Sequence, residues 1–192
     1  MNRNRDTNLS RFPTYIPYIV MALVSASILW MITMRLGNNT VDFALPQVRG
    51  GSFHLRSQPA HPVLLAFLQM VPDTADTPSR SQAVFLLSMA QQYGSHGLTV
   101  VVIDASAFVD LQIPDHTALV NASYDWQMNF PLLEDAGNQI ARRFQIKEVP
   151  TTILLAPDGR VEKFWQGLTR PAVLASGIEK LTGGPLGRLP AL

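Results

Sequence analysis

The sequence of 192 residues contains no cysteine. The chain therefore cannot form a disulfide, bind zinc or an iron–sulfur cluster through thiolates, or use a thiol as a nucleophile. Charged side chains are also scarce, at 15% of the residues, against about 25% in an average soluble domain. The formal net charge is only +1, so the chain lacks the basic surplus typical of nucleic-acid-binding proteins, and we expect no nucleic-acid partner.

The scarcity of charge has a local cause, because residues 12–34 contain no acidic or basic side chain. As an α-helix, these roughly 23 residues would be about 34 Å long, enough to cross a hydrocarbon core of about 30 Å. Tyr18 and Trp30 lie toward its two ends, where interfacial aromatic residues are common. We therefore predict an uncleaved transmembrane signal anchor at 12–34. A cleaved signal peptide ending near 24–26 is the alternative, but the apolar run continues beyond that point.

The basic residues around this span predict its orientation. Arg3, Arg5 and Arg11 precede it, whereas only Arg35 follows closely. By the positive-inside rule the N-terminus is cytoplasmic and the rest of the chain is periplasmic or extracellular. The predicted organisation is a cytoplasmic tail at 1–11, the anchor at 12–34, a linker at 35–40, one domain at 41–182 and a flexible tail at 183–192.

The domain alternates between patterns typical of strands and helices. Residues 63–68 and 98–103 are continuous apolar runs, as expected for strands buried on both faces. Between them Phe85, Met89 and Tyr93 recur at helical spacing, so the two strands are predicted to form a parallel crossover unit. The later elements are a short helix at 114–122, an extended piece at 130–133, a helix at 137–144, a hairpin of 151–155 and 161–165, and a helix at 170–181.

Several short segments, in order, resemble the redoxin branch of the thioredoxin-like superfamily. The first are 41–46 (VDFALP), then Gly51 and Leu55, then the apolar strand at 63–68. The later ones are 130–135 (FPLLED), 140–144 (IARRF), 149–154 (VPTTIL) and 157–161 (PDGRV). The resemblance implies an α/β fold at 41–182, a thioredoxin-like mixed sheet flanked by helices, preceded here by one N-terminal transmembrane helix.

With the anchor included, the chain resembles membrane-tethered, extracytoplasmic thiol-disulfide oxidoreductases of the TlpA/ResA type. The resemblance implies a Cys-x-x-Cys motif at the start of the first helix of the domain, where the helix terminus stabilises a thiolate, and a cis-proline facing it. Pro150 matches the cis-proline. The motif is best matched by Asp76, Thr77, Pro78 and Ser79, and an ungapped match would place it at 72–75. Neither register contains a cysteine, which excludes thiol-disulfide exchange through this chain's own side chains.

These degenerate motif positions have a structural and a functional interpretation. The structural one is that Asp76 or Thr77 caps the helix with Pro78 at its first position. The functional one is a repurposed polar site around Asp76, Thr77 and Ser79. Similarly, Val149, Pro150 and Thr151 are interpreted either as retained fold architecture or as an edge that binds an extended peptide.

Other polar residues give weaker signals. His54, His61, His96 and His116 lack metal-ligand spacing, so we interpret them as surface residues and expect neither a metal nor a cofactor. Glu134 and Asp135 are interpreted as a solvated turn.

Three functional hypotheses follow from these patterns. The leading one is a redox-inactive protein-binding or assembly module, a pseudo-oxidoreductase whose partner lies outside the cytoplasm. A second is an oxidoreductase of the family that acts with a partner's thiols. A third is a structural accessory subunit of a membrane complex, which makes its contact through the span at 12–34.

Overall fold

The computed structural model describes residues 40–58, 61–70, 77–109 and 114–182. The predicted anchor at 12–34, both predicted tails and Asp76 lie outside the described residues. In the part of the chain that is described, no helix is long and apolar enough to cross a membrane. Thr40–Leu192 forms a compact unit, and the description below concerns the described residues of that unit.

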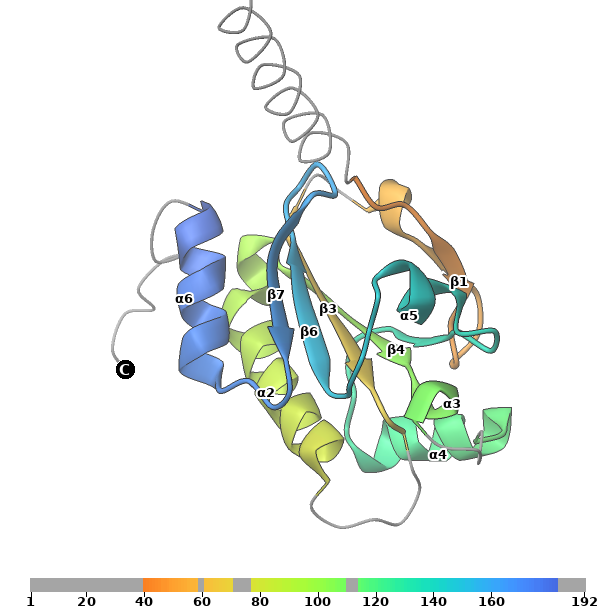
Figure 1. Ribbon diagram of the computed structural model, residues 1–192. Coiled ribbons are helices and arrows are strands. Elements are labelled where there is room, and N and C mark those ends of the chain that lie inside the picture. The colour runs from red at the N-terminus through yellow and green to blue at the C-terminus, as the bar shows by residue number, and fades with distance from the viewer. Residues whose placement is uncertain (1–39, 59–60, 71–76, 110–113, 183–192) are drawn as a thin grey trace, which may run out of the picture. The chain divides into compact units, whose positions relative to one another are not determined.

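A five-stranded mixed sheet forms the centre of the domain, with strand order β5-β4-β3-β6-β7 (Figure 1). Strands β3, β4 and β5 are parallel, whereas β6 is antiparallel to β3 and β7 is antiparallel to β6. The strands are β3 (Val63–Leu68), β4 (Thr99–Asp104), β5 (Leu132–Glu134), β6 (Thr151–Leu155) and β7 (Val161–Gln166). The crossover and the hairpin predicted from the sequence are therefore both present.

Strand β3 lies in the middle of the sheet, and all six of its residues are buried. Leu64, Ala66 and Leu68 belong to the core on one face of the sheet, whereas Leu65 and Phe67 belong to the core on the other. Successive side chains of a strand point to opposite faces. Both faces of the sheet are covered, which explains why this strand is a continuous apolar run.

Helices cover one face, and a mixture of short elements covers the other. The first core takes side chains from α2 (Pro78–Tyr93), α4 (His116–Asp125) and α6 (Pro171–Thr182). The second takes side chains from the hairpin β1 (Ala44–Pro46) and β2 (Ser52–His54), the 3-10 helix Leu55–Ser57 and α5 (Gln139–Arg143). Figure 1 shows α2 and α6 side by side on their face of the sheet. The β1–β2 hairpin and the short helix α3 (Ser106–Val109) were not predicted from the sequence.

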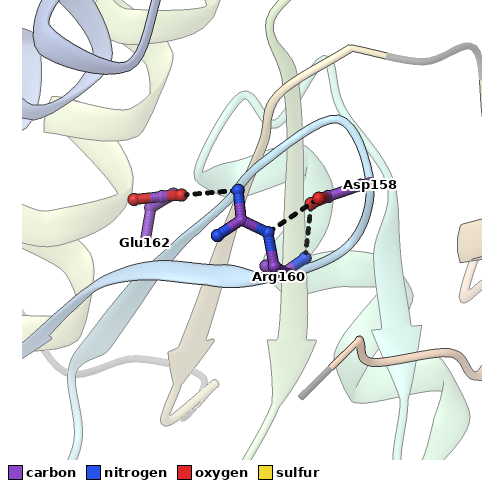
Figure 2. A network of polar contacts seen from close by, with 3 residues as sticks. All are labelled: Asp158, Arg160 and Glu162. Carbon is purple, nitrogen blue, oxygen red and sulfur yellow. Dashed lines mark hydrogen bonds and ion pairs between the residues drawn. The ribbon is translucent and has the colours of Figure 1, made fainter. Parts of the chain in front are cut away.

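The β6–β7 hairpin turns at 157–159, as its Pro-Asp-Gly sequence predicts. Asp158 holds the turn: its Oδ1 accepts a hydrogen bond from Arg160 N at 3.0 Å, and its Oδ2 accepts one from Arg160 Nε at 2.7 Å. The guanidinium also contacts Glu162 Oε1 at 3.4 Å (Figure 2). The hydrogen bonds from Arg160 lower the pKa of the Asp158 carboxyl.

The start of the domain is fastened to this hairpin. Val41 N donates to Gly159 O at 3.0 Å, and Thr40 forms an antiparallel bridge with Arg160. Gly159 has a φ of +82°, and a Cβ there would lie 3.1 Å from Val41 O. Glycine therefore serves both the left-handed turn and the close approach of the first segment.

A buried tyrosine connects α2 to α6. The ring of Tyr93 is 1% exposed, and its hydroxyl donates to Glu179 Oε1 at 2.9 Å. Burial, followed by the hydrogen bond and the negative charge of Glu179, raises the pKa of Tyr93 to about 12. Each of these causes disfavours the tyrosinate, so the contact depends on a protonated hydroxyl.

This contact predicts an alkaline dependence of stability. The native pKa lies above the ordinary value of 10.0, so the contribution of Tyr93 is fully present below pH 10 and is lost as the pH rises towards 12. We expect Tyr93→Phe to lower the free energy of unfolding by about 1 to 2 kcal/mol at pH 8, through loss of the hydrogen bond. The difference should shrink at pH 11, as measured by urea denaturation at both pH values. A difference that is unchanged between pH 8 and pH 11 would contradict this assignment.

Candidate functional site

The residues expected to form a site meet at one end of the sheet, where β3 ends and β6 begins. The register pairs Phe67 of β3 with Thr151 of β6, and pairs Thr151 in turn with Gln166, the last residue of β7. The helix α2 follows β3 in the chain. The start of α2, the start of β6 and the end of β7 therefore all lie at this end, which we call the β3 carboxyl end.

Thr77 and Pro78 begin α2 in the manner of an ordinary helix. Thr77 is the N-cap, and its Oγ1 accepts a hydrogen bond from Arg80 N at 3.1 Å. Pro78 occupies the first helical position, where its missing N–H costs nothing. The structural interpretation of these two positions is confirmed, whereas Asp76 lies outside the described residues.

Ser79, the second cysteine-equivalent position, is used by the fold. Its side chain is 3% exposed, and its Oγ accepts a hydrogen bond from Gln69 N at 3.0 Å. Gln69 is the residue that follows β3, so the hydroxyl fastens the first turn of α2 to the end of the central strand. A buried hydroxyl with a backbone partner is a structural group, and neither its burial nor its contact activates it as a nucleophile.

The Val149–Pro150 peptide bond is cis. Pro150 and Thr151 are buried, whereas Val149 is half-buried. Thr151 lies inside the sheet, between Phe67 and Gln166, and its Oγ1 donates to Glu148 O at 2.7 Å. Of the three residues predicted to form a peptide-binding edge, Val149 is thus the one whose side chain remains partly accessible.

Gln82, which belongs to no motif of the sequence, joins α2 to the segment after β7. Its side chain is fully buried. Its Oε1 accepts from Thr169 N at 2.7 Å, and its Nε2 donates to Thr169 O at 3.3 Å. The sequence signal for this role is a polar residue four positions before Leu86, on the buried face of the helix.

A buried carboxylate lies at the same end of the sheet, on β4. Asp104 is 7% exposed, and its Oδ1 accepts hydrogen bonds from Ser106 N at 3.1 Å and Ser106 Oγ at 2.5 Å. Ser106 Oγ in turn accepts one from Met70 N at 2.7 Å. Burial raises the pKa of Asp104 although these hydrogen bonds oppose the shift, and Glu134 on the neighbouring strand raises it slightly further.

The expectation of a solvated turn at Glu134 and Asp135 is wrong for Asp135, which is 5% exposed. Its Oδ1 accepts from Gln139 N at 2.8 Å, and its Oδ2 accepts from the N–H groups of Ile140 and Ala141 at 2.9 and 3.0 Å. The first N–H groups of a helix lack partners within it, and this carboxylate supplies them for α5. Glu134 is half-buried, and its Oε2 lies 3.2 Å from His116 Nδ1.

The four histidines are exposed, in agreement with their interpretation as surface residues. Among the residues that the structure describes, no three His, Asp or Glu side chains form a group that could hold a metal ion.

The sheet order, the helix that follows β3 and the cis-proline before β6 together define a thioredoxin-like α/β fold. A sequence profile described as the AhpC/TSA family matches residues 36–164. The chain belongs to this family.

Curated relatives and solved structures agree with this assignment. The thiol-disulfide oxidoreductase ResA of Bacillus thuringiensis subsp. konkukian is 22% identical over 149 residues, which is 78% of this chain and 80% of the relative. ResA of Bacillus subtilis is 22% identical over 131 residues, 68% of this chain and 67% of the relative.

Two crystal structures illustrate the shared fold. StoA from Bacillus subtilis has a TM-score of 0.59 at 16% identity, covering 73% of this chain and 98% of that chain. A secreted Mycobacterium tuberculosis disulfide oxidoreductase, described as homologous to E. coli DsbE, has a TM-score of 0.60 at 19% identity, covering 75% and 99%. At these identities the likeness concerns the fold. This chain combines that fold with a complete absence of cysteine.

Two adjacent buried threonines of β6, Thr151 and Thr152, differ in whether the side-chain hydroxyl has a hydrogen-bond partner. Thr151 Oγ1 has a hydrogen-bond partner, as described above, whereas Thr152 Oγ1 has none among the described residues. Both side chains are 0% exposed. The register places Thr152 between Ala66 and Trp165, which are apolar neighbours.

We therefore expect opposite effects from the same substitution at these two positions. Thr152→Val removes an unsatisfied buried hydroxyl and should raise the free energy of unfolding by about 1 kcal/mol. Thr151→Val leaves Glu148 O without its donor and should lower it by about 1 kcal/mol. Urea denaturation of both variants beside the parent chain measures the effect. A loss of stability in both variants would show that Thr152 has a partner.

Proposed function

We propose that this chain is a redox-inactive, thioredoxin-like protein-binding or assembly module, held outside the cytoplasm by an anchor at residues 12–34. One observation carries the proposal: a chain of the AhpC/TSA family has no cysteine in 192 residues. Thiol-disulfide exchange requires a thiolate that attacks a disulfide sulfur. Without a thiol, the fold retains its architecture and loses that reaction.

The contacts of Thr77 and Ser79 favour a binding role over a new catalytic activity at the degenerate motif. Thr77 is occupied as a helix cap and Ser79 as the partner of Gln69 N. Both hydroxyls therefore stabilise the start of α2. Among the residues that the structure describes, neither hydroxyl is paired with a general base that would make it a nucleophile.

The proposed contact edge is formed by Val149, Pro150 and Thr151. Thr151 fixes the edge to the sheet, and Val149 gives it a partly accessible apolar side chain. In the proposed complex an extended partner segment packs beside Val149, the accessible residue of this edge. The partner we propose is a secreted or membrane protein on the same side of the membrane.

The redox assignment predicts the outcome of a simple assay. The purified full chain should reduce a model disulfide, such as insulin with dithiothreitol, no faster than dithiothreitol alone. ResA of Bacillus subtilis, named as a thiol-disulfide oxidoreductase, serves as the positive control under the same conditions. A rate for this chain well above the blank would overturn the proposal.

The anchor and its orientation are tested separately. We expect a periplasm-active reporter, such as alkaline phosphatase, to be active when fused after residue 40, because three arginines lie just before the span and only Arg35 follows it closely. A reporter that works only in the cytoplasm should be inactive at the same position. The reverse pattern would place the domain in the cytoplasm. Carbonate extraction of the full chain tests whether residues 12–34 hold it in the membrane.

A further inference from the structure

A groove of about 300 Å³ lies between α2 and the end of α4, and its lining does not include the residues of the edge at Pro150. We call it the α2–α4 groove. Its lining includes Arg80, Ala83, Val84 and Leu87 from α2, and Asp125 and Trp126 from the end of α4.

On the α2 wall of this groove, the described residues leave two apolar side chains, Val84 and Leu87, wholly or partly exposed. Residues 80, 83, 84 and 87 have the spacing of one helix face, while Leu86 and Met89 face the sheet core. Val84 is 57% exposed, and Leu87 is half-buried. The groove is thus open along α2, with Trp126 buried at its other wall.

Two side chains of opposite charge, Arg80 and Asp125, also line the groove. Arg80 is half-buried and Asp125 is exposed. Neither side chain forms a hydrogen bond or an ion pair with any residue in the described ranges, and the two do not pair with each other. A half-buried guanidinium without a partner gives up hydration without compensation. The groove therefore matches a ligand that brings one acidic and one basic group.

An exposed aromatic residue precedes Asp125 in α4 and is held by an arginine. Tyr124 precedes Asp125 and is 63% exposed. The guanidinium of Arg49 lies 4.4 Å from the centre of its ring, and Arg49 is itself fixed by hydrogen bonds to Ser123 Oγ at 3.0 Å and Ser123 O at 2.8 Å. An exposed aromatic ring held in place this way loses little conformational entropy when a protein packs against it.

We propose that the α2–α4 groove is a docking site for an amphipathic helical segment of a partner protein. The segment places one large apolar side chain over Val84 and Trp126, an acidic side chain at Arg80 and a basic side chain at Asp125. A segment fits better than a small molecule, because an open groove cannot enclose most of a ligand. The inference deepens the proposed function, since it names a second surface through which the module binds proteins.

The probes are synthetic helical peptides of about 16 residues without cysteine. They carry a Leu, Phe or Trp anchor, flanked either by one Glu and one Lys or by two Gln residues. Fluorescence anisotropy of labelled peptides measures binding to the full chain in detergent. We expect the Glu/Lys peptides to bind about tenfold more tightly than the Gln peptides. Equal affinities, or no binding by any peptide, would overturn the proposal.

Variants of the groove provide the matched controls. Val84→Asp should weaken binding at least tenfold, whereas Val173→Asp, at a 42% exposed valine of α6, should not change it. Arg80→Glu and Asp125→Lys should each weaken binding, and the double reversal should recover it, because the peptide then binds in the opposite direction. A merely structural effect would not be recovered in this way.

Two further outcomes would count against the docking site. Equal binding by the Val84→Asp and Val173→Asp variants would show that the peptides bind elsewhere on the surface. Self-association of the chain that Val84→Asp abolishes, as measured by sedimentation, would assign the groove to a second copy. Disulfide reduction by the parent chain would overturn the redox-inactive function alone, because the peptides contain no sulfur.

Discussion

The burial of β3 on both faces is the constraint on which the rest of the domain depends. Among the described strands, only β3 has every one of its residues in one or the other of the two cores. Because each face must be covered, helices α2 and α6 are required on one side and the short elements around α5 on the other. The end of this strand also sets the position of the site, since α2 and β6 are fastened to it through Ser79 and Thr151.

The β3 carboxyl end keeps the architecture of a thioredoxin-like fold in a chain that has no cysteine. The polar groups there are turned inward: Ser79 binds the end of β3, Gln82 binds Thr169, and Asp104 holds Met70 through Ser106. Each satisfies a backbone group that would otherwise be buried without a partner. The polar side chains at this end are therefore used by the fold itself.

Much of the fold follows from local patterns in the sequence, and most of the site does not. The strand at 63–68 and the cap at Thr77 depend on neighbouring residues, so they could be predicted. Gln82 and Thr169 are 87 positions apart, and no local pattern joins them. The three-residue strands of the β1–β2 hairpin are too short to show alternation. The expectation of a solvated Asp135 fails because acidic residues near a turn are usually solvated, whereas the N–H groups at the start of α5 need hydrogen-bond acceptors here.

The hydrogen bond between Val41 N and Gly159 O determines where a force on the first segment enters the domain. The chain enters the domain beside the β6–β7 turn, whereas Thr151 stands at the other end of the same strand. A load applied at Thr40 therefore acts on the turn end of the β6–β7 hairpin, which is the end of β6 farther from the cis-proline segment. A tether at this point would let the domain be pulled or swung while the geometry of its opposite end stays unchanged.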